Sequence, residues 1–128
     1  MTVFESLKKA GVLMHLVLLV SVGVCLLSSA ATAQDRRGTR LWNLTRYTVT
    51  NVQLSPPGQH AWGKNQCEND KDGTVDHGER LRITGITSGV YDIKLGDKGG
   101  RVCIVTNVEV KDGQIFSIEE NQLTNCQK

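Results

Sequence analysis

The chain has 128 residues, and its 15 Lys and Arg nearly balance its 13 Asp and Glu, for a formal net charge of +2. Such a balance argues against nucleic acid or an anionic membrane as the main partner, because both select strongly basic surfaces. A chain of this length has room for one small domain.

Residues 1–33 have the three parts of a secretory signal peptide in the right order. Lys8 and Lys9 give a positive start, residues 11–27 form an uncharged apolar run, and Ala31-Thr32-Ala33 matches the A-x-A cleavage pattern. We predict cleavage after Ala33, which gives a periplasmic or secreted protein without stable membrane insertion. The alternatives are an uncleaved anchor helix, for which the apolar run is short, and lipidation at Cys25.

Residues 34–40 crowd arginines at the new N-terminus, namely Arg36, Arg37 and Arg40. We interpret this segment as a flexible basic arm, with a binding patch as the alternative. The remainder, residues 41–128, is predicted to form a single β-domain.

The first strands of this domain are short. One is expected to begin at Leu41, and residues 47–54 are rich in β-branched side chains. The apolar positions of the second strand change parity between Val49 and Val52, which predicts a bulge near Thr50-Asn51. Residues 55–58 contain two prolines and a glycine and predict its end. A long polar loop then extends to Gly78.

The second half alternates apolar and polar side chains, which is typical of antiparallel strands with one buried face. The expected buried sets are Leu81 with Ile83; Tyr91 with Ile93 and Leu95; and Val102 with Ile104, Val108 and Val110. Asp112-Gly113 predicts a hairpin turn. Residues 117–120 have the form of a capping box, which predicts a short helical turn ending near Leu123. The fold class is therefore mainly β, a small antiparallel β-sandwich or barrel with a short C-terminal helical turn.

Three cysteines remain after cleavage, so one disulfide can form and one thiol is left over. Export makes a disulfide the expected state. We predict that Cys103 pairs with Cys126, which would tie the helical turn to a strand. Cys67, in the polar loop, is expected to be free, with pairing to either of the others as the alternative.

Several short segments occur in a characteristic order. They are Leu41-Trp42-Asn43-Leu44-Thr45, Val52-Gln53-Leu54-Ser55-Pro56, Trp62-Gly63, Gly78-Glu79 before Leu81, Tyr91-Asp92-Ile93-Lys94, and the C-terminal Phe116-Ser117-Ile118 to Leu123 with Cys126. This pattern resembles a widespread, uncharacterised family of small exported bacterial proteins. The resemblance implies a compact periplasmic domain and no particular activity. Many members carry a cysteine just before the Y-D segment, where this chain has Gly89-Val90.

The acidic stretch from Glu68 to Glu79 matches most of a twelve-residue EF-hand calcium loop. The expected ligands are the side chains of Asp70, Asp72, Asp76 and Glu79 with the Thr74 carbonyl, around the sharp turn at Gly73. The match is imperfect because Glu68 replaces the aspartate of the first position. Prolines before the loop and a predicted strand after it also argue against the flanking helices. A solvated acidic turn is the alternative.

No catalytic motif is recognisable, so an enzyme is not expected. Asp92 is predicted to lie on a solvated strand face, and a reactive Cys67 beside Lys64 has thin support. Small exported β-domains with free strand edges suit protein interaction. The chain is therefore predicted to be a non-enzymatic binding or interaction module for a protein or cell-envelope partner, with Trp62 as the candidate anchor. The alternative is a calcium-stabilised domain; no other cofactor is expected.

Overall fold

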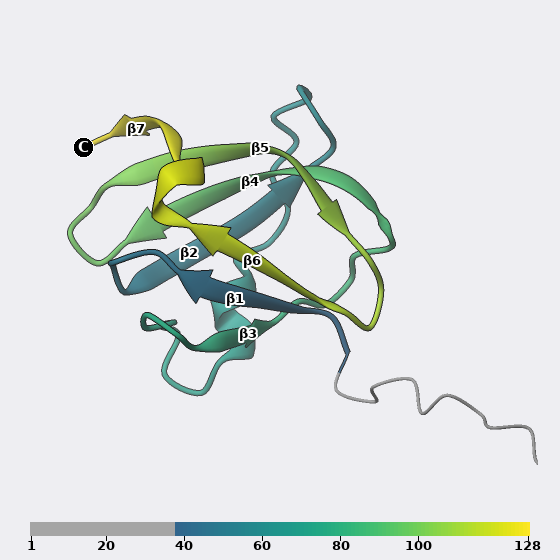
Figure 1. Ribbon diagram of the computed structural model, residues 1–128, viewed down its shortest axis with the longest axis horizontal. Helices are drawn as coiled ribbons and strands as arrows, with labels where there is room; N and C mark the ends of the chain where they lie inside the picture. The colour runs from purple at the N-terminus through teal and green to yellow at the C-terminus, as the bar shows by residue number, and fades with distance from the viewer. Residues whose placement is uncertain (1–37) are drawn as a thin grey trace, which may run out of the picture. The chain divides into compact units, whose positions relative to one another are not determined.

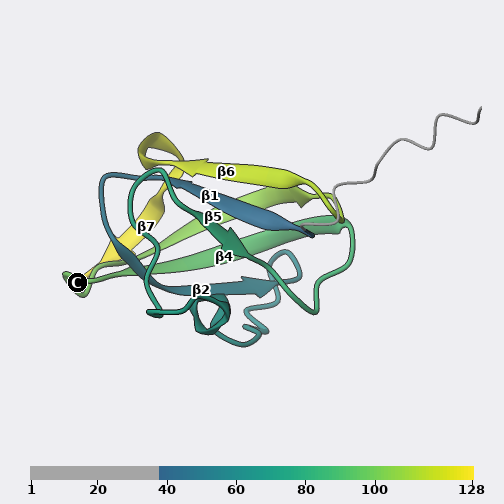
Figure 2. The same cartoon turned by 90° about the horizontal axis from the view of Figure 1, so that it is seen from below.

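The computed structural model describes residues 38–128, which fold into two β-sheets packed on one another (Figure 1). Sheet A has the strand order β3-β1-β6, with bounds Arg80–Arg82 for β3, Arg40–Leu44 for β1 and Ile115–Glu119 for β6. Sheet B has the order β2-β4-β5-β7, with bounds Val49–Ser55, Gly89–Asp97, Val102–Val110 and Thr124–Gln127. The view in Figure 2 separates the layer of β1 and β6 from the layer of β2 and β4. The predicted fold class is confirmed.

The core lies between the sheets and is built from alternate residues of their strands. On β1 the buried leucine is Leu41, and it faces Phe116 of β6 and Leu81 of β3 in the sheet register. The other fully buried side chains of the core include Val52, Ile93, Val110 and Ile118. This alternation is what two packed sheets require, since each strand turns every second side chain inward.

The ordered domain begins before the predicted boundary at Leu41. Thr39 is only 4% exposed, and its hydroxyl donates to Asp112 and accepts from the backbone N–H of Gly113. Residues 38–40 of the expected flexible arm therefore belong to the fold. The predicted signal peptide and residues 34–37 lie outside the described residues.

The predicted bulge in β2 is confirmed, because its pairing with β4 shifts register between Val49 and Asn51. The inward positions predicted for β5 are wrong in its first half. There Cys103 and Val105 are buried, and Val102 is exposed. The strand changes parity at Asn107, which has a positive φ of 56°, so that Val110 faces the core again.

The Asp112-Gly113 turn forms, but it does not make a hairpin. The strand before it, β5, belongs to sheet B, and the strand after it, β6, belongs to sheet A. In sheet A, β6 runs parallel to β1. The turn therefore carries the chain from one sheet to the other.

Helical structure in residues 38–128 consists of two 3₁₀ turns, η1 (Gln66–Asn69) and η2 (Glu120–Gln122). The predicted C-terminal helical turn begins later than expected. Ser117 lies within β6, and Glu119 with Gln122 forms the capping box. The short strand β7, which follows η2, was not predicted. No helix in this part of the chain is long and apolar enough to cross a membrane.

Candidate functional site

Each sheet ends in an edge strand on both sides of the sandwich. On the side of β2 and β3, the loop from residue 63 to residue 75 covers these edges. Val49, on the edge strand β2, exchanges two backbone hydrogen bonds with Val75, at 2.9 and 2.8 Å. Further along β2, the Asn65 side chain accepts from the Val52 N–H at 2.9 Å and donates to the Thr50 carbonyl at 3.0 Å. One amide side chain thus replaces a neighbouring strand for these residues.

The same loop covers the end of β3 in sheet A and the residues that follow it. Gln66 accepts from the Thr84 N–H and donates to the Thr84 carbonyl, both at 3.0 Å. The Asn69 amide donates to the Arg82 carbonyl at 2.9 Å. Because edge strands present unpaired backbone groups that recruit other chains, these amides block strand addition on this side.

On the opposite side, between β5 and β6, the C-terminal segment closes only one end. β7 pairs with Val102 and Ile104 of β5, and the predicted disulfide between Cys103 and Cys126 is confirmed. Next to it, Arg101 binds Asp97 at 2.9 Å and Glu120 at 3.0 Å. These contacts fasten η2 and β7 to the hairpin between β4 and β5.

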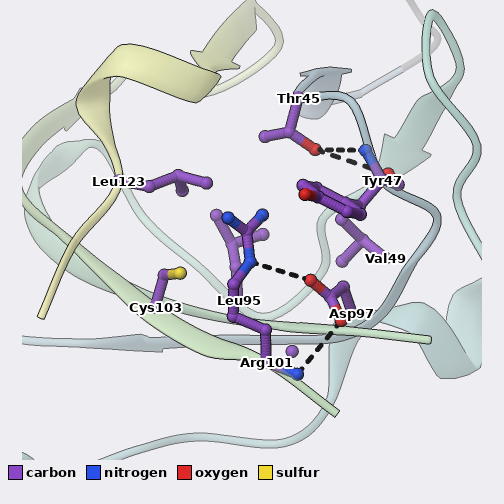
Figure 3. A pocket seen from close by; sticks show the side chains of 9 residues that line it. Thr45, Tyr47, Val49, Leu95, Asp97, Arg101, Cys103 and Leu123 are labelled. Atoms are coloured by element: carbon purple, nitrogen blue, oxygen red, sulfur yellow. Dashed lines mark hydrogen bonds and ion pairs between the residues drawn. The ribbon is translucent and has the colours of Figure 1, made fainter. Parts of the chain in front are cut away.

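Figure 3 shows this closed end. Tyr47 lies over the Arg101 guanidinium, 4.0 Å from ring centre to Cζ. The hydrogen bond to Glu120 raises the pKa of Arg101. Desolvation acts to raise the pKa of Asp97, but the hydrogen bonds from Arg101 and Gly99 hold it below its ordinary value. The cavity here is about 10 Å³, which is at the lower limit for one water molecule. We therefore interpret this cluster as a structural contact that holds η2 and β7 against the hairpin between β4 and β5.

The rest of this side is open. Beyond Val105, no strand of the described domain pairs with β5 on the side away from β4. A groove of about 180 Å³ lies there, lined by Glu109, Lys111, Gln114, Ile115 and Phe116. We call this groove, with the free edges of β5 and β6 beside it, the open seam. Ile115 is 42% exposed, and Phe116 is partly buried against the core.

The backbone of β6 presents free hydrogen-bonding groups at the open seam. In a parallel pair, successive residues of a strand direct their N–H and C=O alternately to its two sides. Arg40 of β1 donates to the Gln114 carbonyl, so Phe116 and Ile118 face β1. Ile115 and Ser117 therefore direct their backbone groups outward, where the described residues supply no further strand. The backbone groups of Glu119 also point outward, but its N–H donates to the side-chain oxygen of Gln122 at 2.7 Å.

Trp62, the candidate anchor, lies elsewhere. It is half-buried on the outer face of sheet B, with the Lys94 ammonium 4.5 Å from its ring centre and His60 at its edge. The neighbouring Gly63 donates to the Leu54 carbonyl and accepts from the Gln53 side chain. An interaction role for Trp62 stays a prediction.

The residues of the acidic loop are held by local hydrogen bonds. Asp72 accepts from the N–H and the hydroxyl of Thr74, which lowers the pKa of Asp72. Asp76 accepts from the Thr48 hydroxyl at 2.6 Å, and Glu79 accepts from the Asp76 N–H at 2.8 Å. Within residues 38–128, three or more potential ligands do not gather into a metal-binding group. Calcium binding by this loop stays a prediction.

Of two predictions about single residues, the one for Cys67 is confirmed and the one for Asp92 is corrected. Cys67 is free, as expected, but it is fully buried, and burial raises the pKa of its thiol to about 11. Lys64 binds Asn69, at 3.1 Å. Asp92, predicted to be solvated, is only 8% exposed and accepts from the N–H groups of Gly58 and Asn107. It joins the loop after β2 to the bulge in β5.

Sequence reasoning missed every residue of the open seam. The seam exists because residues 111–114 cross between the sheets, and a two-residue turn motif does not reveal which sheet the next strand joins. The usable signal was two consecutive apolar residues, Ile115 and Phe116, directly after the turn: in an alternating strand one of such a pair faces outward, and here it is Ile115.

Comparison with known proteins gives no further guidance. No protein-family model matches the chain, and neither the curated proteins nor the solved structures contain a match.

Proposed function

We propose that this protein is an exported, non-enzymatic binding module that accepts an extended polypeptide segment as an additional strand at the open seam. The observation that carries the proposal is the contrast between the two sides of the sandwich. One side is covered by the amides of Asn65, Gln66 and Asn69. On the other side, no strand of residues 38–128 pairs with the outward backbone groups of Ile115 and Ser117, which lie beside a groove.

Strand addition would use both features of the seam. The outward N–H and C=O groups of Ile115 and Ser117 supply main-chain hydrogen bonds, which give affinity without regard to sequence. Alternate side chains of the added strand would enter the groove and contact Phe116 and Ile115, which gives selectivity for apolar residues. The ion pair of Lys111 with Glu109, at 3.6 Å, leaves the rim with little net charge.

Export is supported by the disulfide between Cys103 and Cys126, since such bonds persist in oxidising compartments. The signal-peptide pattern of residues 1–33 points the same way. The partner would therefore be a protein of the cell envelope or of the exterior that exposes an extended segment.

The test compares two substitutions at one position. Ser117→Pro removes the outward N–H of β6, which an edge strand tolerates, and Ser117→Ala keeps that N–H. Wild-type protein and each variant are used to select from a phage-displayed library of random peptides. We expect the wild type and Ser117→Ala to enrich the same peptides, and Ser117→Pro to lose them. Bound peptide should also slow amide hydrogen exchange at residues 115–117.

Thermal melting of both variants shows whether they fold. If Ser117→Pro folds and retains the selected peptides with wild-type affinity, strand addition at β6 is wrong. If the wild type enriches no peptide, the open seam is not a polypeptide site.

A further inference from the structure

A second feature lies on the outer face of sheet A. The side chains of Leu41 and Leu81 are buried, so the residues on either side of them face outward. In the antiparallel register Arg40 stands opposite Arg82, and Trp42 stands opposite Arg80. Three arginines are therefore gathered on one face of a small sheet. Arg80 and Arg82 are both exposed.

Some cations of the described domain are paired with carboxylates: Arg101 with Asp97 and Glu120, and Lys111 with Glu109. Within residues 38–128 no carboxylate oxygen lies within 4.0 Å of the Arg80 or Arg82 guanidinium. The guanidinium groups of these two side chains are therefore available to bind an external anion.

The position of Arg80 is fixed by its neighbour. Its guanidinium lies 4.7 Å from the ring centre of Trp42, in a cation–π contact. The Trp42 indole is itself held by a 2.9 Å hydrogen bond from Nε1 to the Gly78 carbonyl. Arg80 is thus ordered before any ligand arrives, which lowers the entropy that binding must overcome.

We propose that this face, made by Arg80 and Arg82 beside Trp42, binds a multivalent oxyanion, that is, a ligand presenting two or more phosphate or carboxylate groups. A guanidinium offers a planar fork of donors that matches either group in a bidentate way. Along one strand, Arg80 and Arg82 are about 7 Å apart, a spacing that neighbouring groups of such a ligand can match. The site is separate from the open seam and does not depend on strand addition.

The probe is inorganic tripolyphosphate, titrated into the full domain by calorimetry at low ionic strength. We expect binding by the wild type, and a loss of affinity of about tenfold or more in Arg80→Gln and in Arg82→Gln. Lys98→Gln is the matched control, because Lys98 is an exposed cation in the turn of sheet B. Its affinity should stay within about twofold of the wild type. Ser117→Pro should bind tripolyphosphate normally, which separates this site from the open seam.

Sedimentation with phosphatidylcholine vesicles, with and without phosphatidylglycerol, distinguishes a lipid headgroup from a free oxyanion as the source. Binding to either probe that is lost in the arginine variants supports the proposal. Absence of binding to both probes, or an equal loss in Lys98→Gln, overturns it.

Discussion

At the scale of single residues, side-chain amides take the place of backbone partners in this protein. Asn43 is the most buried example: it accepts from the N–H and hydroxyl of Thr45 and donates to the carbonyls of Tyr47 and Val75. Asn65 does the same for the edge of β2. Residues of this kind determine which strand edges stay available.

Replacing Asn65 tests this role. Asn65→Ala leaves the Val52 N–H and the Thr50 carbonyl without their partner, and also removes the cap of the Cys67 N–H. We expect the free energy of unfolding to fall by about 2 kcal/mol. Asn51→Ala is the control, because the Asn51 amide donates only to the Gln53 side chain. Its loss should stay below about 0.5 kcal/mol. Urea denaturation measures both, and equal losses would contradict the edge-covering role of Asn65.

The buried thiol of Cys67 predicts a dependence of stability on alkaline pH. Its pKa is raised by burial from 9.0 to about 11. The native state therefore holds this proton more tightly than the unfolded state does. The resulting stability is fully present below pH 9.0 and is lost as the pH rises toward about 11. We expect unfolding free energies of the wild type to decline more steeply than those of Cys67→Ala over this range. Parallel curves for the two proteins would refute the shift.

The short segments that carry the resemblance were visible in the sequence, but their structural roles were not. Asn43 and Thr45 of the N-x-T segment form the buried network described above. Ser55 of the S-P segment accepts from the Ala61 N–H, and Asp92 of the Y-D segment holds two loops. Apart from the bond between the Asn43 and Thr45 side chains, the partners are backbone N–H and carbonyl groups outside the strand that carries the motif. Alternation along a strand does not report such a partner, which is why Asp92 was predicted to be solvated.

At the scale of elements, β7 depends on the disulfide more than on its strand pairing. Its residues are exposed, and they contact β5 through two register pairs and the Thr124 hydroxyl. Cys126→Ser should lower the free energy of unfolding by about 3 kcal/mol, and reduction of the wild type should have the same effect. Released β7 exposes the edge of β5 at residues 102–104, so we also expect concentration-dependent association in light scattering. A variant that stays monomeric with unchanged stability would contradict this account.

The strands themselves were largely predictable, because alternation of apolar side chains marks any strand with one buried face. The bulge in β2 followed from a change of parity within one apolar run. The bulge at Asn107 did not, since Val102 and Ile104 are apolar on the outer face as well. Strand order could not be predicted from the sequence either. The pairing of β6 with β1 is decided by packing across the whole domain, and it leaves no local sequence pattern.

At the scale of the whole domain, calcium is the clearest discriminator between the two functions considered from the sequence. Three carboxylates of the acidic loop are already engaged: Asp72 with Thr74, Asp76 with the Thr48 hydroxyl, and Glu79 with the Asp76 N–H. We therefore expect identical melting temperatures in millimolar calcium and in chelator. A bound ion at a hundredfold excess over its Kd would add about 2.7 kcal/mol, or roughly 10 °C or more. A shift of that size, abolished by Asp72→Ala and by Glu79→Gln, would establish the calcium-stabilised domain instead.

The parallel pairing of β1 with β6 has a consequence for the order of assembly. The contact between Thr39 and Gly113 joins residues 74 positions apart, and sheet A stays incomplete until both ends of the domain meet. Closing so long a stretch of chain costs conformational entropy before the native contacts form that compensate for it, and this slows folding. The domain should therefore reach its native state slowly, and only after its last strands have been released from whatever holds them extended. Under the proposed export through a translocation pore, such a delay would be an advantage, because the chain must cross the pore unfolded.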